Sequence, residues 1–496
     1  MNEPLAKPDP PNLSPEEFRT LGHELVDRIA EFYRGLPERA VTRDEDPASI
    51  RAALPPNGLP ADGKDASQLL EETSKLLFEH SLHNGHPRFI GYITSSASPL
   101  GALGDLLVAA VNANVGLWDL APAATEIEAQ SIRWIAELIG YPTDCGGLMV
   151  SGGNMANLIG FFAARRAKAS WDVRASGTAG VRLTLYASKE THTWIQKAAD
   201  LAGLGTDAIR WVRTDHAQRM DVLDLERRVE ADRAAGHAPF LVVGSAGTVS
   251  TGAVDPLPEI AALCAERGLW FHVDGAYGAP AAALEEAPAA LRGLAAADSV
   301  ALDPHKWLYS PLEAGCALVR SRAALVDAFS FHPDYYRLDD ASTEPKLHYY
   351  EHGIQNSRGF RALKVWLAMR HAGRAGIVAA IRRNIALARR LFDAAEGHTE
   401  LEARTQNLSL TTFRYVPADL EPGSEAIDTY LNALNEELLV RLQRGGEAFV
   451  SNAVVDGCYL LRACLVNFRT TEDDIDAIID IVARLGRACD RDLRPA

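Results

Sequence analysis

The chain has 496 residues, of which 47% are hydrophobic and 23% are charged, a balance typical of a soluble globular protein with two or three lobes. Acidic side chains outnumber basic ones 66 to 50, and the net charge of −16 argues against nucleic acid as the main partner. The six cysteines form no Cys-x-x-Cys pair, which argues against a zinc ribbon or a disulfide scaffold and favours the cytoplasm. The N-terminus lacks a basic segment followed by an apolar one, and polar residues interrupt the most apolar stretch, residues 101–118. We therefore expect neither a signal peptide nor a membrane span.

The N-terminal segment is expected to be helical. Ser14-Pro15-Glu16-Glu17 combines an N-cap, a first-turn proline and a capping-box glutamate. The apolar residues that follow recur every three or four positions and form one face: Phe18, Leu21, Leu25, Ile29 and Phe32. Prolines and glycines between residues 55 and 63 separate this helix from a second one near residues 69–78. The pair can pack on its own chain or on a second subunit, and the sequence leaves both open.

The middle of the chain, from about residue 147 to residue 320, alternates between short apolar runs and helical stretches, which is typical of an α/β domain. Most of the runs are apolar throughout, as expected for strands covered on both faces. Seven strands are predicted, at residues 148–150, 183–187, 209–212, 240–243, 270–273, 300–302 and 316–319. After residue 361, two helices, a strand at 459–466 and a last helix indicate a smaller C-terminal domain.

Lys306 follows one of these apolar runs, in the segment Val-Ala-Leu-Asp-Pro-His-Lys-Trp at residues 300–307. A lysine that follows a buried strand and lies between a histidine and a tryptophan is partly desolvated. Such an amine can lose its proton and attack an aldehyde. Lys306 is therefore a candidate Schiff-base lysine, although the segment taken alone is more often a surface lysine after a strand.

Asp274 ends a second apolar strand, in Trp-Phe-His-Val-Asp-Gly-Ala-Tyr at residues 270–277. A buried carboxylate is costly unless a positive group pairs with it. The protonated ring nitrogen of pyridoxal 5'-phosphate (PLP) is such a group, and an acid opposite this nitrogen with a lysine on the aldehyde is the usual PLP arrangement. The alternative is that Asp274 only caps a helix.

A glycine turn joins a strand to a helix in Leu-Met-Val-Ser-Gly-Gly-Asn-Met-Ala-Asn at residues 148–157. Glycines allow backbone N–H groups to approach a ligand closely, and a helix N-terminus attracts anions, so a phosphate would bind at Gly153 and Asn154. The segment lacks the lysine of a P-loop and the spacing of a dinucleotide fingerprint. Taken alone it is a weak signal, because glycine turns before helices are common.

Together these segments carry a family resemblance. The motifs at residues 151–157, 272–277 and 303–307 resemble those of the group II PLP-dependent decarboxylases, which act on aromatic amino acids, histidine, glutamate and cysteine sulfinate. The likeness covers nearly the whole chain and includes Glu-Glu-Phe-Arg at 16–19, His-Pro-Arg-Phe at 86–89, Pro-Ala-Ala-Thr-Glu at 122–126, Phe-Arg-Ala-Leu-Lys at 360–364 and Leu-Arg at 461–462. Within the family the chain most resembles the aromatic-L-amino-acid branch.

The resemblance implies roles for individual residues. Lys306 holds the cofactor, His192 stacks over its ring, Asp274 contacts the ring nitrogen, and Tyr335 donates a proton to Cα, with adjacent Tyr336 as the alternative. The residues expected to bind the cofactor are Gly153, Asn154, His192, Ser245, Asp274, Ala276, His305 and Lys306. The residues expected to bind the substrate are Tyr92, Ile93, Ser95, Leu117 and Trp118.

Several positions depart from the family pattern. Asp303 replaces a frequent asparagine and adds a charge near the expected phosphate, for which the sequence gives no reason. Asn154 stands where many relatives have serine or threonine and can still donate a hydrogen bond to phosphate. Ile93 and Leu117 replace phenylalanines of the animal aromatic decarboxylases, and residues 116–126 are one residue shorter, which weakens the inference to one particular substrate.

A metal site is not expected. His80, His83 and His86 are spaced by three residues, as ligands on one helix face would be. Gly85 and Pro87 interrupt a helix at this point, and the family resemblance accounts for His86 and Pro87.

The resemblance implies a fold-type-I PLP architecture of the α/β class. We expect an N-terminal helical segment at residues 1–85, a large PLP-binding domain with a mostly parallel seven-stranded sheet at 86–372, and a small C-terminal α/β domain at 373–496. The active site is expected at the interface of a homodimer. The expected reaction is PLP-dependent decarboxylation of an L-amino acid, with an aromatic one favoured, to an amine and carbon dioxide.

Three other functions stay open on the sequence. An aldehyde synthase of the same fold would add oxidative deamination, although such enzymes often change a residue that matches Tyr335 or His192. A decarboxylase of an acidic or aliphatic amino acid is compatible with the altered pocket positions. A nucleotide-binding or regulatory α/β protein without catalysis would need Lys306 and Asp274 to coincide by chance.

Overall fold

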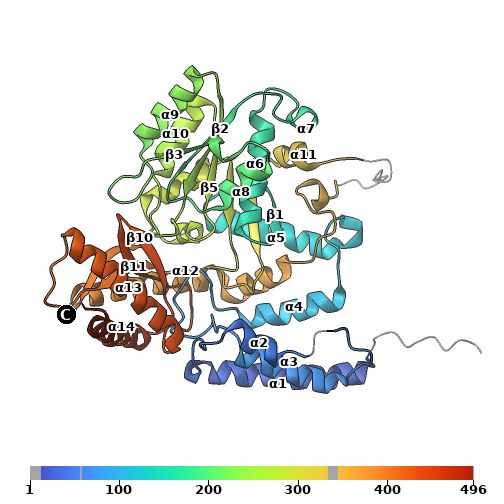
Figure 1. Cartoon of the computed structure of the whole chain (residues 1–496). Coiled ribbons are helices and arrows are strands. Elements are labelled where there is room, and N and C mark those ends of the chain that lie inside the picture. The colour runs from blue at the N-terminus through green and yellow to red at the C-terminus, as the bar shows by residue number, and fades with distance from the viewer. Residues whose placement is uncertain (1–12, 56–57, 333–344, 495–496) are drawn as a thin grey trace, which may run out of the picture.

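A seven-stranded sheet forms the centre of the larger part of the molecule (Figure 1). The computed structural model describes residues 13–55, 58–332 and 345–494. The strands are β1 (Gly146–Val150), β2 (Leu183–Ser188), β3 (Ile209–Val212), β4 (Ala238–Ser245), β5 (Trp270–Asp274), β6 (Ser299–Leu302) and β7 (Gly315–Val319), in the spatial order β1-β7-β6-β5-β4-β2-β3. Only β7 runs antiparallel to its neighbours. The predicted α/β class with a mostly parallel seven-stranded sheet is therefore confirmed.

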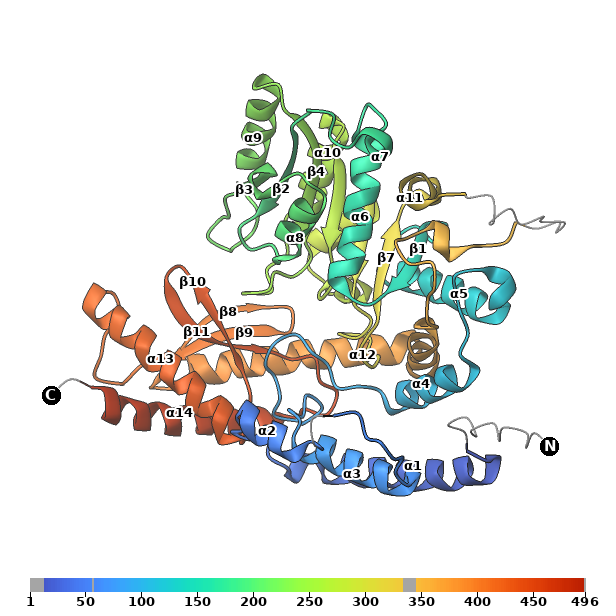
Figure 2. The same cartoon turned by 45° about the vertical axis from the view of Figure 1, so that its right-hand side comes forward.

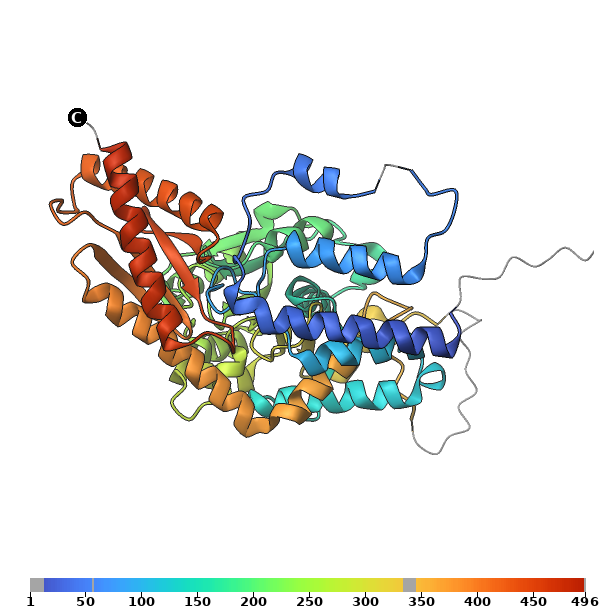
Figure 3. The ribbon, with the colours of Figure 1, turned by 90° about the horizontal axis from the view of Figure 1, so that it is seen from below.

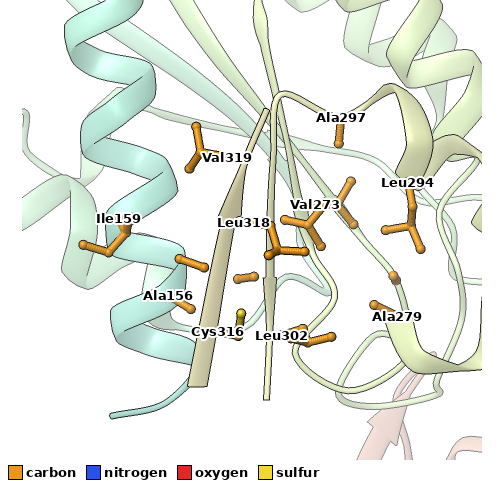
Figure 4. Packing of buried hydrophobic residues seen from close by; sticks show 14 of the residues in the cluster. Ala156, Ile159, Val273, Ala279, Leu294, Ala297, Leu302, Cys316, Leu318 and Val319 are labelled. Carbon is orange, nitrogen blue, oxygen red and sulfur yellow. The ribbon is translucent and has the colours of Figure 1, made fainter. Parts of the chain in front are cut away.

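Helices pack against the sheet and bury its strands. They are α5 (Pro122–Leu138), α6 (Gly153–Lys168), α8 (Trp194–Leu201), α9 (Val222–Ala234), α10 (Leu257–Arg267) and α11 (Arg322–Phe329). Two further helices lie outside this layer: α4 (Pro99–Val111) packs on the helix at Ala362–Glu396, and the short α7 (Val173–Ser176) packs on α6. In Figure 4, Ala156 and Ile159 of α6 lie on one side of the strands, while Leu294 packs from the other side. Every residue of β1, β2, β6 and β7 is buried, which explains why these strands read as continuous apolar runs.

A long helix, α12 (Ala362–Glu396), connects this sheet to a second one (Figure 2). Ile377 and Ile381 belong to the core of the large sheet, whereas Leu387 and Leu391 pack in a second core. The second sheet is antiparallel, with the order β10-β11-β9-β8. The strands of this sheet are β8 (Leu401–Asn407), β9 (Leu410–Tyr415), β10 (Ser451–Val455) and β11 (Cys458–Cys464). Two helices of the same part of the chain pack with it, α13 (Glu425–Gly445) and α14 (Glu472–Leu493). Helix α12 breaks its regular geometry at Gly373 (φ 63°) but continues through the predicted boundary at 372/373, so the domain limits stay predictions.

The N-terminal segment forms α1 (Pro15–Gly35), α2 (Pro47–Ala53) and α3 (Ala66–Glu79). The predicted capping box at Ser14 and Glu17 is present. Phe32 of α1 stacks on Phe78 of α3 at a ring distance of 4.5 Å, and the two helices lie side by side at the surface (Figure 3). No residue of α1 is fully buried: Phe18 is exposed, and the other four residues of its apolar face are only partly covered in the single chain. Within the described ranges, none of the helices has the length and apolar character needed to cross a membrane.

Candidate active site

The carboxyl ends of β1, β4, β5 and β6 meet at one edge of the large sheet, where parallel α/β proteins usually bind ligands. The residues that follow these strands surround a cavity of about 350 Å³, which is in the size range of small-molecule sites. Its walls are Ile93, Ser151, Gly152, Gly153, Asn154, Met155, Asn157, His192, Gly247, Val249, Asp274, Ala276, Tyr277, Asp303, His305 and Lys306. Segments that are far apart in the sequence therefore converge here.

Lys306 enters the cavity from a turn directly after β6. The Lys306 N–H donates to the Asp303 carbonyl at 2.9 Å, which closes the turn. Trp307 is fully buried; its ring stacks on Tyr277, and its indole N–H donates to Asn384 Oδ1 at 3.1 Å. The buried tryptophan therefore fixes the backbone from which the Lys306 side chain extends.

Asp274 is the last residue of β5. Its carboxylate accepts one N–H on each oxygen, from the Trp194 indole to Oδ2 at 2.8 Å and from the Ala276 backbone to Oδ1 at 3.2 Å. Ser245 ends the neighbouring strand β4 and pairs in register with Asp274, but it does not line the cavity. Both donors to Asp274 are neutral, so they satisfy its oxygens without neutralising its charge.

His192 lies on the loop between β2 and α8. Its Nδ1 accepts the backbone N–H of Trp194 at 3.2 Å. Burial lowers the pKa of the imidazole, and the Lys306 ammonium lowers it further, while the negative charge of Asp274 opposes both. The ring is therefore neutral near pH 7, with its proton on Nε2.

The Gly152-Gly153 turn before α6 has the features of an anion cradle. A Cβ on Gly153 would lie 2.7 Å from Asp303 Oδ2, and a Cβ on Gly315 would lie 2.6 Å from Cα of Gly152, so the close approach of these backbones requires glycine. The first N–H groups of α6 have no partner within the helix and point out of its N-terminus, at the Gly152-Gly153 turn. With Lys306 for an aldehyde and Asp274 for a ring nitrogen, these residues fit PLP.

Asp303 lies against the same turn and is almost fully buried. Its Oδ2 is 3.0 Å from Lys306 Nζ and 3.6 Å from His305 Nε2, while its Oδ1 has no hydrogen-bond partner. His305 Nδ1 accepts the Ala314 N–H at 3.1 Å, so a neutral His305 carries its proton on the Nε2 that faces Asp303. Asp303, whose charge the family pattern leaves unexplained, is thus the counter-ion of Lys306.

The predicted substrate residues are divided between the cavity and its surroundings. Ile93 lines the cavity, and the Ser95 hydroxyl donates to the His305 carbonyl at 2.7 Å. Tyr92 is half exposed, with its backbone N–H bonded to Ser451 Oγ at 3.2 Å. Leu117 and Trp118 lie outside the cavity walls of their own chain, and the Trp118 indole donates to Glu126. Tyr335 and Tyr336 lie outside the described residues.

Four residues near the site were missed by the sequence analysis. Met155 and Val249 line the cavity but carry no polar signal that marks a site. Trp194 directly follows the predicted His192 segment, and this adjacency was an available signal. Arg462 was noted only for its family likeness; it is buried, donates to Ser451 Oγ at 2.8 Å, and has two side-chain nitrogens without a partner.

Comparison with known proteins identifies the family. Residues 47–416 match the pyridoxal-dependent decarboxylase conserved domain. The chain is 34% identical over 464 residues to an aromatic-L-amino-acid decarboxylase of Bacillus atrophaeus, covering 93% of this chain and 94% of the relative. It is 30% identical over 480 residues to a phenylacetaldehyde synthase of Petunia hybrida, covering 95% and 94% of the two chains.

A solved structure agrees with these sequence matches. The crystal structure of Oryza sativa TDC with PLP and tryptamine superimposes with a TM-score of 0.89 and 28% identity, covering 96% of this chain and 99% of that one. Cofactor and fold class were thus predicted correctly from the sequence. The chain belongs to the pyridoxal-dependent decarboxylase family, and it is a PLP-dependent amino acid decarboxylase.

Proposed function

We propose that this enzyme removes the α-carboxylate of an aromatic L-amino acid and releases the corresponding amine. The observation that carries the proposal is the convergence of Lys306, Asp274 and His192 on one cavity at the carboxyl edge of the sheet. The aromatic substrate is supported by the identity to the Bacillus atrophaeus aromatic-L-amino-acid decarboxylase and by the apolar walls Ile93, Met155 and Val249.

Each polar side chain has a separate task in this proposal. When bound, PLP supplies an electron sink for the electron pair that remains on Cα after carbon dioxide leaves. Lys306 Nζ holds the aldehyde carbon and gives it up to the substrate amine. Asp274 keeps a proton on the ring nitrogen, because a partly buried carboxylate favours a cationic partner. His192 stacks over the ring and offers Nε2–H to the substrate carboxylate, and Tyr335 returns a proton to Cα.

The cofactor's phosphate is assigned to the Gly153 and Asn154 turn, with His305 beside it. Ala276, which lines the cavity, completes the proposed cofactor contacts. Ser245 ends β4 next to Asp274 but does not line the cavity, so its proposed contact requires its hydroxyl to reach past the cavity wall. The free N–H groups at the start of α6 support this assignment, because they are oriented for an anion.

A homodimer is part of the proposal. Apolar side chains of α4 are about half exposed in the single chain: Leu103, Leu106, Leu107 and Val111. Such a row on one helix indicates a protein interface. Leu117, Trp118 and Tyr92 lie outside the cavity of their own chain, which supports their assignment to the substrate site of a second subunit. All six cysteines are free thiols, which supports a reducing, cytoplasmic location.

The second candidate is an aldehyde synthase, favoured by the 30% identity to the Petunia hybrida enzyme. The two reactions diverge after decarboxylation, when Cα either takes a proton or reacts with dioxygen. The presence of both Tyr335 and His192 supports the amine route.

The products formed from a panel of amino acids test the function. The PLP-loaded enzyme is expected to convert phenylalanine, tyrosine, tryptophan or 3,4-dihydroxyphenylalanine to amine with a kcat/KM at least about tenfold above that for glutamate, histidine or cysteine sulfinate. Mass spectrometry of the products and a peroxide assay distinguish amine from aldehyde. Preference for an acidic or aliphatic substrate, or equimolar aldehyde and peroxide, would overturn the proposal.

Borohydride reduction tests the role of Lys306. Reduction of the PLP-loaded enzyme and peptide mapping should place the pyridoxyl group on Lys306, because this Nζ is the lysine nitrogen that lines the cavity. Lys364 is a suitable control, since it is buried outside the cavity and pairs with Asp105 at 3.1 Å. Lys306→Ala should lose the label and Lys364→Ala should keep it; the reverse result contradicts the assignment.

Asp303→Asn tests the position of the phosphate. The carboxylate lies against the proposed phosphate cradle, and like charges in one site repel each other. Removing its charge should raise the affinity for PLP by about tenfold, with a much smaller gain for pyridoxal, which lacks the phosphate. Equilibrium dissociation constants from fluorescence titration provide the measurement. Equal changes for both ligands would mean that Asp303 acts only on Lys306.

Tyr335→Phe tests the proton donor. The change removes the acidic hydroxyl and keeps the ring, so amine formation should slow while aldehyde, ammonia and peroxide appear. The ratio of amine to aldehyde is the measurement, with Tyr336→Phe as the matched control. Should only Tyr336→Phe shift this ratio, the donor is Tyr336; should neither do so, the family role does not apply to this chain.

A further inference from the structure

Trp194 contacts both of the groups proposed to act on the cofactor ring. Its indole N–H donates to Asp274 Oδ2, and its backbone N–H donates to His192 Nδ1. We propose that Trp194 is a positioning residue that orients Asp274 and keeps it ionised, so that the shared proton stays on the ring nitrogen of bound PLP. This inference rests on the proposed role of Asp274.

The position of the indole is fixed by the protein core. Trp194 is the first residue of α8 and is 1% exposed. Its ring meets the edge of His272 at 5.6 Å, and His272 is itself bonded through both nitrogens, to Ser299 Oγ and Asn157 Oδ1 at 2.7 Å each. Burial lowers the pKa of His272 to about 4, so this neighbour stays neutral. The indole therefore cannot turn away from Asp274 without disturbing the core under the site.

The hydrogen bond favours the ionised carboxylate. One proton lies between Asp274 and the ring nitrogen, either as N–H⁺ beside a carboxylate or as neutral nitrogen beside a carboxylic acid, and no other reactant is involved. A donor to a carboxylate stabilises its charged form and lowers its affinity for a proton. Of the two hydrogen bonds that Asp274 accepts, the one from the Trp194 indole is shorter, at 2.8 Å, than the one from the Ala276 backbone, at 3.2 Å. Without the indole N–H, a larger fraction of the molecules should have a neutral ring nitrogen beside a protonated Asp274.

A matched control exists in the same sheet. Trp270 is also buried, and its indole N–H donates to Ser299 Oγ at 2.8 Å, but it has no contact with Asp274. Trp194→Phe and Trp270→Phe thus remove the same group from neighbouring parts of one core. The backbone N–H of residue 194 remains in Trp194→Phe, so the hydrogen bond to His192 is retained.

The experiment measures the protonation of the ring nitrogen directly. Each variant is loaded with PLP labelled with ¹⁵N in the ring, and the ¹⁵N chemical shift is recorded by NMR. The ratio of protonated to unprotonated nitrogen should fall about 10- to 100-fold in Trp194→Phe, the range for one hydrogen bond to a charged group, and should stay at the wild-type value in Trp270→Phe. If Trp194→Phe fails to fold, 3-benzothienylalanine at position 194 keeps the shape and lacks the N–H.

The outcomes separate this inference from the function on which it rests. A protonated nitrogen in the wild type and in Trp194→Phe, with an unprotonated one in Asp274→Ala, overturns the role of Trp194 alone. An unprotonated nitrogen in the wild type, or a protonated one in Asp274→Ala, overturns the role of Asp274. Equal loss in Trp194→Phe and Trp270→Phe would show a general packing effect and also contradicts the inference.

Discussion

Two carboxylates, Asp274 and Asp303, lie at the ends of neighbouring strands and are largely shielded from water, and the organisation of the site depends on how their charges are balanced. A shielded charge is costly unless a partner of opposite charge or several donors compensate it. Asp303 has a cation, Lys306, at 3.0 Å. Asp274 has only the N–H groups of Trp194 and Ala276, and within the described ranges no basic side chain forms an ion pair with it. Asp274 is therefore the acid suited to a cationic ligand.

The fold places these acids within one cavity because β5 and β6 are parallel neighbours. The register pairs Asp274 with Ala301, so the two strands end at the same edge of the sheet. Strand β1 lies on the other side of β7, and the turn that follows it reaches the same edge of the sheet. The glycine at position 315 in β7 lets the backbone of this turn, at Gly152, approach the backbone of β7 closely. Buried strands on both sides hold these ends in place, so the polar groups are carried by a rigid scaffold.

The sequence predicted the parts of this arrangement that leave a local signature. Continuous apolar runs gave the seven strands, and Lys306, Asp274 and Gly153 were found because each follows such a run. Trp194 was missed because its bond to Asp274 joins residues 80 positions apart, and no periodicity records such a contact. Met155 and Val249 were missed because apolar cavity walls have the same composition as the core. The ion pair of Asp303 was missed for a related reason, since a sequence motif lists the charges but not the distances between them.

The two acids contact different groups in the cavity. Asp303 faces the amine of Lys306, and its unpaired Oδ1 lies toward Gly152, the side on which an anion would bind. Asp274 lines the cavity on the side assigned to the ring, and it accepts the N–H of a neutral indole, which has no acidic or basic group to compete for a proton. Under the proposed function, the carboxylate of Asp303, 3.0 Å from Lys306 Nζ, would hold the free lysine amine within the cavity between turnovers. With one acid beside the lysine and another beside the place assigned to the ring, the proposed reaction would let Lys306 change its charge without removing the proton from the ring nitrogen.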